Sequence, residues 1–143
     1  MANDPQQDYP AVFAVRPNLR VLVVEDDADL ASHLATLLSR CGHTVRIASD
    51  GAAALEATQA NAPDVVLLDI GLPGMDGYQV ARRVREDMAP AMPKAPLLIA
   101  VTGRDGEADR RRSQEVGIDL HLVKPVYPGQ LLRLLERFQR IIR

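Results

Sequence analysis

Runs of consecutive hydrophobic residues recur along the chain without alternating with polar ones. The clearest are Val21–Val24, Val65–Leu68 and Leu97–Val101. Unalternating apolar runs of this length are typical of strands buried on both faces, as in a parallel sheet covered by helices. Two shorter segments, Thr44–Ala48 and Asp119–Val123, complete a set of five predicted strands.

Between these strands, apolar residues return at helical spacing. Helices are predicted over residues 30–41, 51–60, 78–88 and 107–116, and from Pro128 to the end of the chain. Gly42 and Gly117 follow two of them, where glycine commonly ends a helix, and the proline-rich stretch 88–96 predicts an irregular connection. The alternation predicts an α/β fold, a doubly wound five-stranded parallel sheet of order 2-1-3-4-5 with helices on both faces.

Composition indicates one globular domain. The 143 residues are 47% hydrophobic and 25% charged, and a net charge of −2 gives no sign of a general nucleic-acid binder. The single cysteine, Cys41, excludes an intrachain disulfide and favours a reducing, cytoplasmic location. No apolar run approaches the roughly 20 residues of a membrane-spanning helix, so we expect no membrane insertion. Residues 1–18 are expected to be a tail or linker and residues 19–143 the folded domain.

Chemically active side chains follow four of the five predicted strands. Glu25 and Asp26 follow the first strand, Asp69 ends the third, Thr102 follows the fourth and Lys124 the fifth. In this fold the carboxyl ends of the strands lie at one edge of the sheet. Three carboxylates meeting there repel one another and should raise at least one pKa unless a cation intervenes. Oxygen ligands suit Mg²⁺, and a lysine and a hydroxyl group beside them predict phosphoryl transfer to an oxygen nucleophile.

Each of these residues also has an ordinary structural alternative. Asp69 could merely end its strand, although Asp76 is better placed to cap the next helix. Asp27 could be only a helix cap, Lys124 a solvated lysine, and Thr102 a strand-end residue that bonds to its own backbone. Their joint placement at the ends of the correct strands favours a functional site.

Together these residues resemble the motifs of response-regulator receiver domains, over about residues 19–142. The shared motifs are Glu25-Asp26 after the first strand, Asp69 with Leu72-Pro73-Gly74-Met75-Asp76-Gly77, Thr102-Gly103, and Lys124-Pro125. The resemblance implies a phospho-accepting domain of a two-component phosphorelay. Such a domain is no enzyme beyond catalysing its own phosphorylation and dephosphorylation. Its implied partners are a histidine kinase or histidine phosphotransfer protein and an unidentified downstream protein.

The resemblance also implies a metal site. Asp69 would accept the phosphoryl group from a partner phosphohistidine and would share Mg²⁺ with the acidic pair. Asp26 would bind the ion directly and Glu25 through water, with the backbone carbonyl of Gly71 as a further ligand. Asp27 lies one position beyond the pair of the family and is left out of the metal site.

The remaining implied roles belong to the last two strands. Thr102 would hydrogen-bond the phosphoryl group, Lys124 would neutralise its charge, and the peptide bond from Lys124 to Pro125 would be cis. Receiver domains commonly carry Tyr or Phe, as a rotamer switch linked to Thr102, where this chain has His121. His121 is therefore either the switch or a partly exposed strand histidine. Residues 119–126 resemble receiver domains attached to hybrid histidine kinases, which leaves a hybrid or a stand-alone origin open.

Alternatives to an active receiver remain at this point. No residues are left for a DNA-binding or enzymatic output domain, so we expect output through protein contacts and no direct DNA binding. A pseudo-receiver would share the fold without being phosphorylated. A phosphatase of the aspartyl-phosphate type would need an acid where Gly71 stands. A flavodoxin-like cofactor binder would need a phosphate-cradling loop where the chain has the acidic Glu25–Asp27.

The predicted helix 107–116 differs from the others in its lack of apolar residues. It contains only Ala108 and Val116, whereas the final helix has seven apolar positions. Burial of such side chains anchors a helix, so helix 107–116 should be held more weakly than the final helix. Its centre, Arg110-Arg111-Arg112, is either a solvated basic face or a surface for a charged partner. Since mobile elements come from the less stable parts of a fold, we expect this helix and the neighbouring strand to face a partner.

Overall fold

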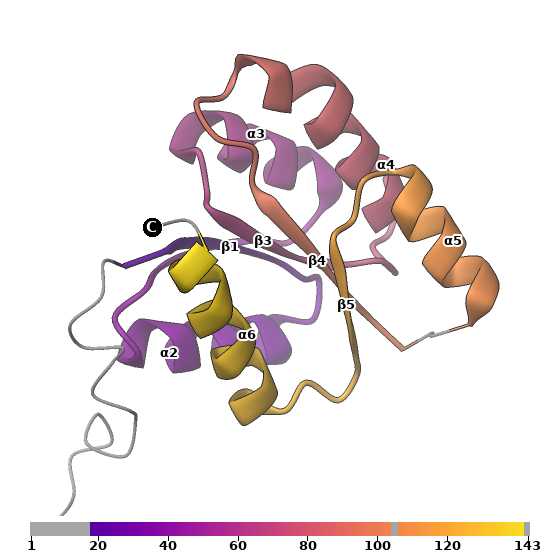
Figure 1. The fold of residues 1–143 in the computed structure, drawn as a ribbon. Coiled ribbons are helices and arrows are strands. Elements are labelled where there is room, and N and C mark those ends of the chain that lie inside the picture. Colours follow the sequence, from indigo (N-terminus) through magenta and orange to yellow (C-terminus); the bar gives the residue numbers. More distant parts are fainter. Residues whose placement is uncertain (1–17, 104–105, 142–143) are drawn as a thin grey trace, which may run out of the picture.

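The computed structural model describes residues 18–103 and 106–141, in which a five-stranded sheet lies between two layers of helices (Figure 1). The strand order is β2-β1-β3-β4-β5 and every neighbouring pair is parallel, as predicted. The strands are β1 (Arg20–Val24), β2 (Thr44–Ala48), β3 (Val65–Asp69), β4 (Leu97–Thr102) and β5 (Leu120–Val123). The expected tail lies outside the described residues except for Asn18, as does Ile142 of the final helix.

Helices connect the strands at nearly the predicted positions. They are α2 (Ala28–Arg40), α3 (Gly51–Asn61), α4 (Gly77–Arg83), α5 (Glu107–Glu115) and α6 (Pro128–Ile141). The prediction of one regular helix over 78–88 was wrong in its second half. The chain becomes a π-helix over Val84–Met88 and then a short 3₁₀ turn over Ala89–Ala91. Pro90 has no backbone N–H to donate, so a regular helix cannot continue through it.

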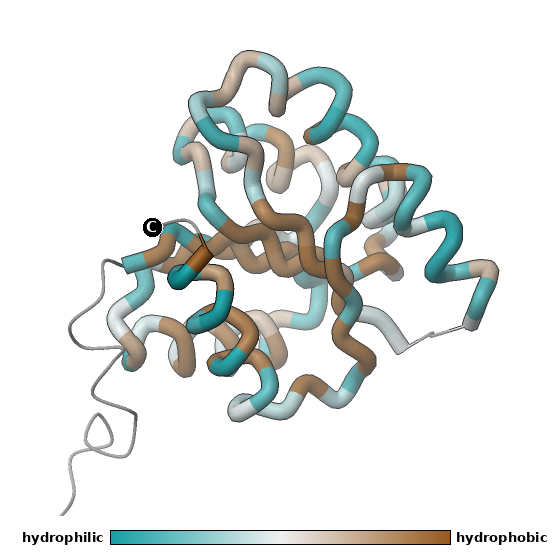
Figure 2. The backbone as a smooth tube through the Cα atoms, viewed as in Figure 1, coloured by the Kyte–Doolittle hydropathy of each residue, from teal (hydrophilic) through white to brown (hydrophobic). Residues whose placement is uncertain are grey.

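Each face of the sheet has its own hydrophobic core. Helices α2 and α6 cover one face, and α3, α4 and α5 lie over the other (Figure 1). Successive side chains of a strand point to opposite faces. Val65 and Leu67 therefore enter the first core, and Val66 and Leu68 the second. Every residue of β3 is buried, which accounts for its unalternating apolar run, and Figure 2 shows the hydrophobic centre of the sheet.

Two aspartates cap helices that begin next to the carboxyl ends of the strands. The Asp27 side chain accepts hydrogen bonds from the N–H groups of Asp29 and Leu30 at the start of α2. Asp76 accepts from the N–H of Gln79, whose side chain bonds back to the Asp76 N–H, so α4 begins with a capping box. The predicted capping roles of Asp27 and Asp76 are thus confirmed, and both helix starts are fixed in place.

Helices α5 and α6 differ in anchoring as predicted. Within α5 only Ser113 is buried, and Ala108 is exposed. Helix α6 buries Leu131, Leu132 and Leu135, although Ile141 at its end is 78% exposed. No helix in the described ranges is long and apolar enough to span a membrane.

A buried histidine, His43, is expected to make the stability of the fold depend on pH. The His43 ring is 6% exposed, and its Nδ1 accepts a hydrogen bond from the Leu19 N–H at 3.2 Å. Its Nε2 is buried and has no hydrogen-bond partner among the described residues. Burial disfavours the charged ring and lowers the pKa of His43 below its usual value.

We expect the free energy of unfolding to fall as the pH drops below about 6.5, since the unfolded state then binds the proton more readily. The loss from His43 can reach about 1.4 kcal/mol per pH unit. In His43→Gln, which keeps an acceptor, urea denaturation should show a smaller loss than in the wild type. Replacing the exposed His33 with Gln is the control and should leave the loss unchanged. Equal losses in all three proteins would contradict the prediction.

Candidate functional site

The predicted acidic residues meet at the carboxyl edge of the sheet. Val24 of β1 pairs with Leu68 of β3, so the residues that follow, Glu25 and Asp69, lie side by side. One carboxylate oxygen from each of Glu25, Asp26 and Asp69 lies within 4.8 Å of the others. Glu25 and Asp69 are buried, with 3% and 6% exposure, while Asp26 is exposed. The cluster is therefore largely withdrawn from water but open to it on the Asp26 side.

Lys124 brings a positive charge to the buried carboxylates. Its Nζ lies 3.2 Å from Glu25 Oε1 and 3.5 Å from Asp69 Oδ1, and its side chain is 32% exposed. The Lys124 N–H donates to the Thr102 carbonyl at 2.9 Å, which fixes the chain as it leaves β5. Partial burial alone would lower the pKa of Lys124, but hydrogen bonds and attraction from the two carboxylates raise it. The alternative of a merely solvated lysine is wrong.

Glu25 is the carboxyl whose ionisation the cluster changes most clearly. Its pKa is raised to about 7, first by burial and then by the hydrogen bond and the repulsion from Asp69. The Asp27 N–H, 3.3 Å from Glu25 Oε2, and Lys124 act in the opposite direction. The expectation of at least one raised carboxyl pKa is confirmed, with burial rather than repulsion as the largest cause.

Strands β4 and β5 carry the two remaining predicted side chains, those of Thr102 and His121. Asp69 pairs with Val101, so Thr102 lies one residue beyond Asp69 on the next strand, and it is buried. On β5, His121 pairs with Ala100 and is half-buried. Partners in register point to the same face, and Ala100 and Thr102 share a face, so Thr102 and His121 lie on the same side of the sheet. This placement is compatible with either interpretation of His121.

The loop after β3 is held against Asp69 by its own backbone. The Gly71 N–H donates to Asp69 Oδ1 at 3.1 Å, and the Gly77 N–H donates to the Ile70 carbonyl at 3.0 Å. A Cβ atom on Gly77 would lie only 2.6 Å from the Asp69 carbonyl oxygen. The close fit of Gly77 was not predicted. Its one sign in the sequence was the position of a glycine directly after Asp76, the residue that caps α4. The peptide bond between Lys124 and Pro125 is cis.

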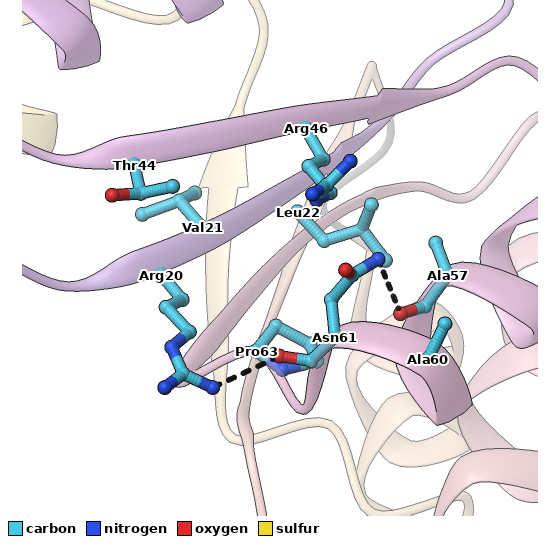
Figure 3. Close-up of a pocket in the computed structure, with 9 residues that line it drawn as sticks. All are labelled: Arg20, Val21, Leu22, Thr44, Arg46, Ala57, Ala60, Asn61 and Pro63. Atoms are coloured by element: carbon cyan, nitrogen blue, oxygen red, sulfur yellow. Dashed lines mark hydrogen bonds between the residues drawn. The ribbon is translucent and has the colours of Figure 1, made fainter.

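A separate pocket of about 290 Å³ lies where the strands begin, away from the acidic cluster. It lies between β1, β2 and the end of α3, with Arg20 and Arg46 among its lining residues (Figure 3). Arg20 Nη1 donates to the Asn61 carbonyl at 3.2 Å, and Asn61 Nδ2 donates to the Ala57 carbonyl at 3.2 Å. None of the predicted site residues lines this pocket.

A doubly wound parallel sheet with a carboxylate cluster and a lysine at the strand ends defines a signalling domain of the receiver class. The family model of the response regulator receiver domain matches residues 21–136. The chain belongs to this family of two-component signalling proteins, whose general function is to accept a phosphoryl group.

Curated relatives and solved structures agree with this assignment. The sensory transduction protein RegX3 of Mycolicibacterium smegmatis is 38% identical over 123 residues, which are 86% of this chain and 50% of the relative. The response regulator MprA of Mycobacterium ulcerans is 35% identical over 129 residues, 88% of this chain and 51% of the relative. The chain thus spans about half the length of these curated relatives.

Two solved receiver domains have the same fold. A CheY-like receiver domain protein from Methanospirillum hungatei gives a TM-score of 0.77 at 27% identity, covering 87% of this chain and 95% of that chain. The BeF3-activated N-terminal receiver domain of Klebsiella pneumoniae RstA gives 0.75 at 29% identity, covering 85% of this chain and 98% of that chain. The fold predicted from the strand pattern is therefore that of known receiver domains.

Proposed function

We propose that Asp69 accepts a phosphoryl group from the phosphohistidine of a histidine kinase or a histidine phosphotransfer protein, and that the chain then changes its contacts with a downstream protein. The observation that carries this proposal is the position of the Lys124 ammonium group. It lies 3.2 Å from the buried Glu25 carboxylate and 3.5 Å from that of Asp69. A nucleophilic carboxylate, a fixed cation and further acidic ligands are what phosphoryl transfer onto an aspartate requires.

In the transfer, an Asp69 carboxylate oxygen attacks phosphorus while the bond from phosphorus to the imidazole nitrogen breaks. The electron pair of that bond stays on the imidazole, which leaves as a neutral ring when its other nitrogen carries a proton. Lys124 offsets negative charge on the phosphoryl oxygens, and Thr102 offers a hydroxyl donor to one of them. The same residues would assist hydrolysis of the acyl phosphate, so the chain would catalyse its own phosphorylation and dephosphorylation.

The chemistry of the donor set fits Mg²⁺. Three carboxylates lie within reach of a single ion, and Mg²⁺ prefers oxygen ligands that include one or two carboxylates. We assign direct binding to Asp26 and Asp69, binding through water to Glu25, and a further contact to the Gly71 carbonyl. When bound, the ion supplies positive charge to the phosphoryl oxygens. The exposure of Asp26 gives an ion access to the cluster.

The test is phosphorylation by acetyl phosphate with Mg²⁺, followed by intact-mass measurement. The wild type should gain the mass of one phosphoryl group, and Asp69→Asn should gain none. Asp50→Asn is the matched control, because Asp50 caps α3 and an asparagine can also cap. This variant should be modified like the wild type. An unmodified wild type would favour the alternative of a pseudo-receiver, and a modified Asp69→Asn would exclude Asp69 as the acceptor.

A role for His121 as the switch gives a further prediction. Phosphorylation should move the His121 ring toward Thr102 and shift its ring-proton NMR signals, while the exposed His33 provides an internal control. His121→Ala should leave phosphorylation of Asp69 nearly intact but weaken the phosphorylation-dependent partner interaction. Unchanged His121 signals in the phosphorylated protein would identify it as an ordinary strand histidine.

We propose a cytoplasmic location and no direct contact with DNA. The buried Cys41 is the only cysteine of the chain, which suits a reducing compartment. The net charge of −2 provides no general attraction to nucleic acid.

A further inference from the structure

A groove of about 550 Å³ lies between α4 and α5, outside the carboxylate cluster. Its base is formed by Tyr78 and Val116, which are almost fully buried, and by the half-buried Met75. Met75 belongs to the loop that follows Asp69, so the groove begins close to the proposed phosphoryl site. The base is apolar and can accept a hydrophobic side chain of a ligand.

Arginines line this groove, and none of its lining residues in the described part of the chain is acidic. They are Arg82, Arg83 and Arg112. Arg83 pairs with Asp87 at 2.6 Å, and Arg112 lies 4.0 Å from the Asp76 carboxylate, but both pairs are well exposed and therefore weak. The Arg82 side chain makes no hydrogen bond or ion pair with any residue that the structure describes. A chain with a net charge of −2 thus concentrates positive charge in one groove.

Arg112 is held in position by an aromatic ring. Its Cζ lies 4.4 Å from the centroid of the Tyr78 ring, a cation–π contact between α5 and α4. The stacked face of a guanidinium group leaves the N–H donors at its edge available to a carboxylate. Arg112 is therefore better prepared to bind an acidic group than a freely moving surface arginine.

Helix α5 itself is loosely attached. Its one buried side chain is that of Ser113, and the Ser113 hydroxyl has no hydrogen-bond partner within the described part of the chain. Figure 2 shows α5 as almost entirely hydrophilic. The contacts of Arg112 with Tyr78 and the burial of Val116 at its end tie it to the domain. A ligand in the groove would add contacts to α5, which buries fewer of its own residues than the other α-helices in the described part of the chain.

We propose that the groove between α4 and α5 binds an acidic segment of a partner protein, with carboxylates on Arg82 and Arg112 and a hydrophobic side chain against Met75. Opposite charge and the apolar base of the groove together define this partner. The inference deepens the proposed function by naming the surface and the chemistry of a partner. It places this partner on the α4 side of α5, whereas the sequence pointed to α5 and the neighbouring strand.

The test uses two short fluorescein-labelled peptides, one of repeating Glu-Glu-Leu and one of repeating Gln-Gln-Leu. They are titrated into unphosphorylated protein without Mg²⁺, and fluorescence anisotropy and amide NMR signals are recorded. The glutamate peptide should bind and shift the amide signals of Gly74, Gln79 and Val116. The glutamine peptide should bind at least about fivefold more weakly, as expected when two exposed ion pairs are lost.

Arginine variants identify the groups responsible. Arg82→Gln with Arg112→Gln should weaken the glutamate peptide about fivefold or more. Arg111→Gln is the matched control on the same helix, because its side chain is 69% exposed and does not line the groove. It should change the affinity by less than about twofold. If loss of the Tyr78 contact unfolds the double variant, Arg82→Gln alone should weaken the glutamate peptide about two- to threefold, as expected when one exposed ion pair is lost.

Several results would overturn the proposal. They are no binding of the glutamate peptide, equal binding of the two peptides, an equal loss in Arg111→Gln, or amide shifts confined to other helices. Asp69→Asn should bind the glutamate peptide as the wild type does. The peptide experiments use unphosphorylated protein, so a failure of peptide binding would leave the proposal that Asp69 accepts a phosphoryl group standing. Conversely, a wild type that acetyl phosphate cannot phosphorylate would not contradict peptide binding in the groove.

Discussion

Replacing Gly77 with alanine is expected to lower the free energy of unfolding by about 1–3 kcal/mol, the usual cost of forcing an extra carbon into a packed site. A Cβ at this position would lie 2.6 Å from the Asp69 carbonyl oxygen and 2.7 Å from the Ile70 Cα. Both are backbone atoms at the end of β3, and neither can turn aside as a flexible side chain would. Helix α4 would have to move away from the strand, which loosens the buried Val80 and Ala81.

Two opposing effects decide whether Gly77→Ala raises or lowers the free energy of unfolding. Alanine favours helix over glycine by up to about 1 kcal/mol, which would stabilise α4 if space allowed. The contact with two backbone atoms should exceed that gain. Urea denaturation measures the difference, and slower phosphorylation by acetyl phosphate would show that Asp69 has moved as well.

Gly103→Ala is the matched control for this prediction. A Cβ on Gly103 would meet no atom of the described residues within 4 Å, although this residue also follows a strand at the same edge of the sheet. It should change the free energy of unfolding by less than about 0.5 kcal/mol. If Gly77→Ala proves as stable as Gly103→Ala, the close packing of α4 against Asp69 is not what fixes the loop.

The layers of the fold were predictable because they depend on local sequence patterns. A strand buried on both faces must be apolar throughout, and β3 is. Strand ends in a doubly wound sheet converge, so the meeting of Glu25, Asp69 and Lys124 followed from topology once five strand–helix pairs had been recognised. These inferences needed no knowledge of side-chain direction beyond the alternation along a strand.

Features that depend on tertiary contacts were not predictable. Arg85 donates to the carbonyl groups of Gly117 and Pro96, at 2.9 and 2.8 Å, and to the Asp119 carboxylate at 2.6 Å. It thus ties the π-helical segment to the starts of β4 and β5, but in the sequence it is one of several arginines on a helix. The contact of Arg112 with Tyr78 depends in the same way on how α5 is rotated against α4. The spacing of residues along the chain indicates neither the Arg85 hydrogen bonds nor the contact of Arg112 with Tyr78.

Asp69→Asn is expected to raise the melting temperature in the absence of divalent metal ions. One oxygen from each of the three carboxylates lies within 4.8 Å of the others, and among the described residues Lys124 is the cation that pairs with Glu25 and Asp69. Asparagine keeps an oxygen that can accept the Gly71 N–H and removes one of the buried charges. The Glu25 carboxyl has a folded-state pKa of about 7 against an ordinary value of 4.5, so it destabilises the fold increasingly as the pH rises from about 4.5 to 7. The gain from Asp69→Asn should therefore be largest above about pH 7, where Glu25 is ionised.

Mg²⁺ should reverse the order of the two proteins. An ion that binds only the folded state adds about 2.7 kcal/mol at a hundredfold excess over its Kd. The wild type should gain this stabilisation, while Asp69→Asn should gain less because it has lost a ligand. NaCl at equal ionic strength separates binding from screening, since screening alone would raise both melting temperatures. If the melting temperatures respond neither to Mg²⁺ nor to the substitution, the three carboxylates do not share one site. A reversal of the two melting temperatures that Mg²⁺ causes and NaCl does not is the result expected of three converging acids and one lysine.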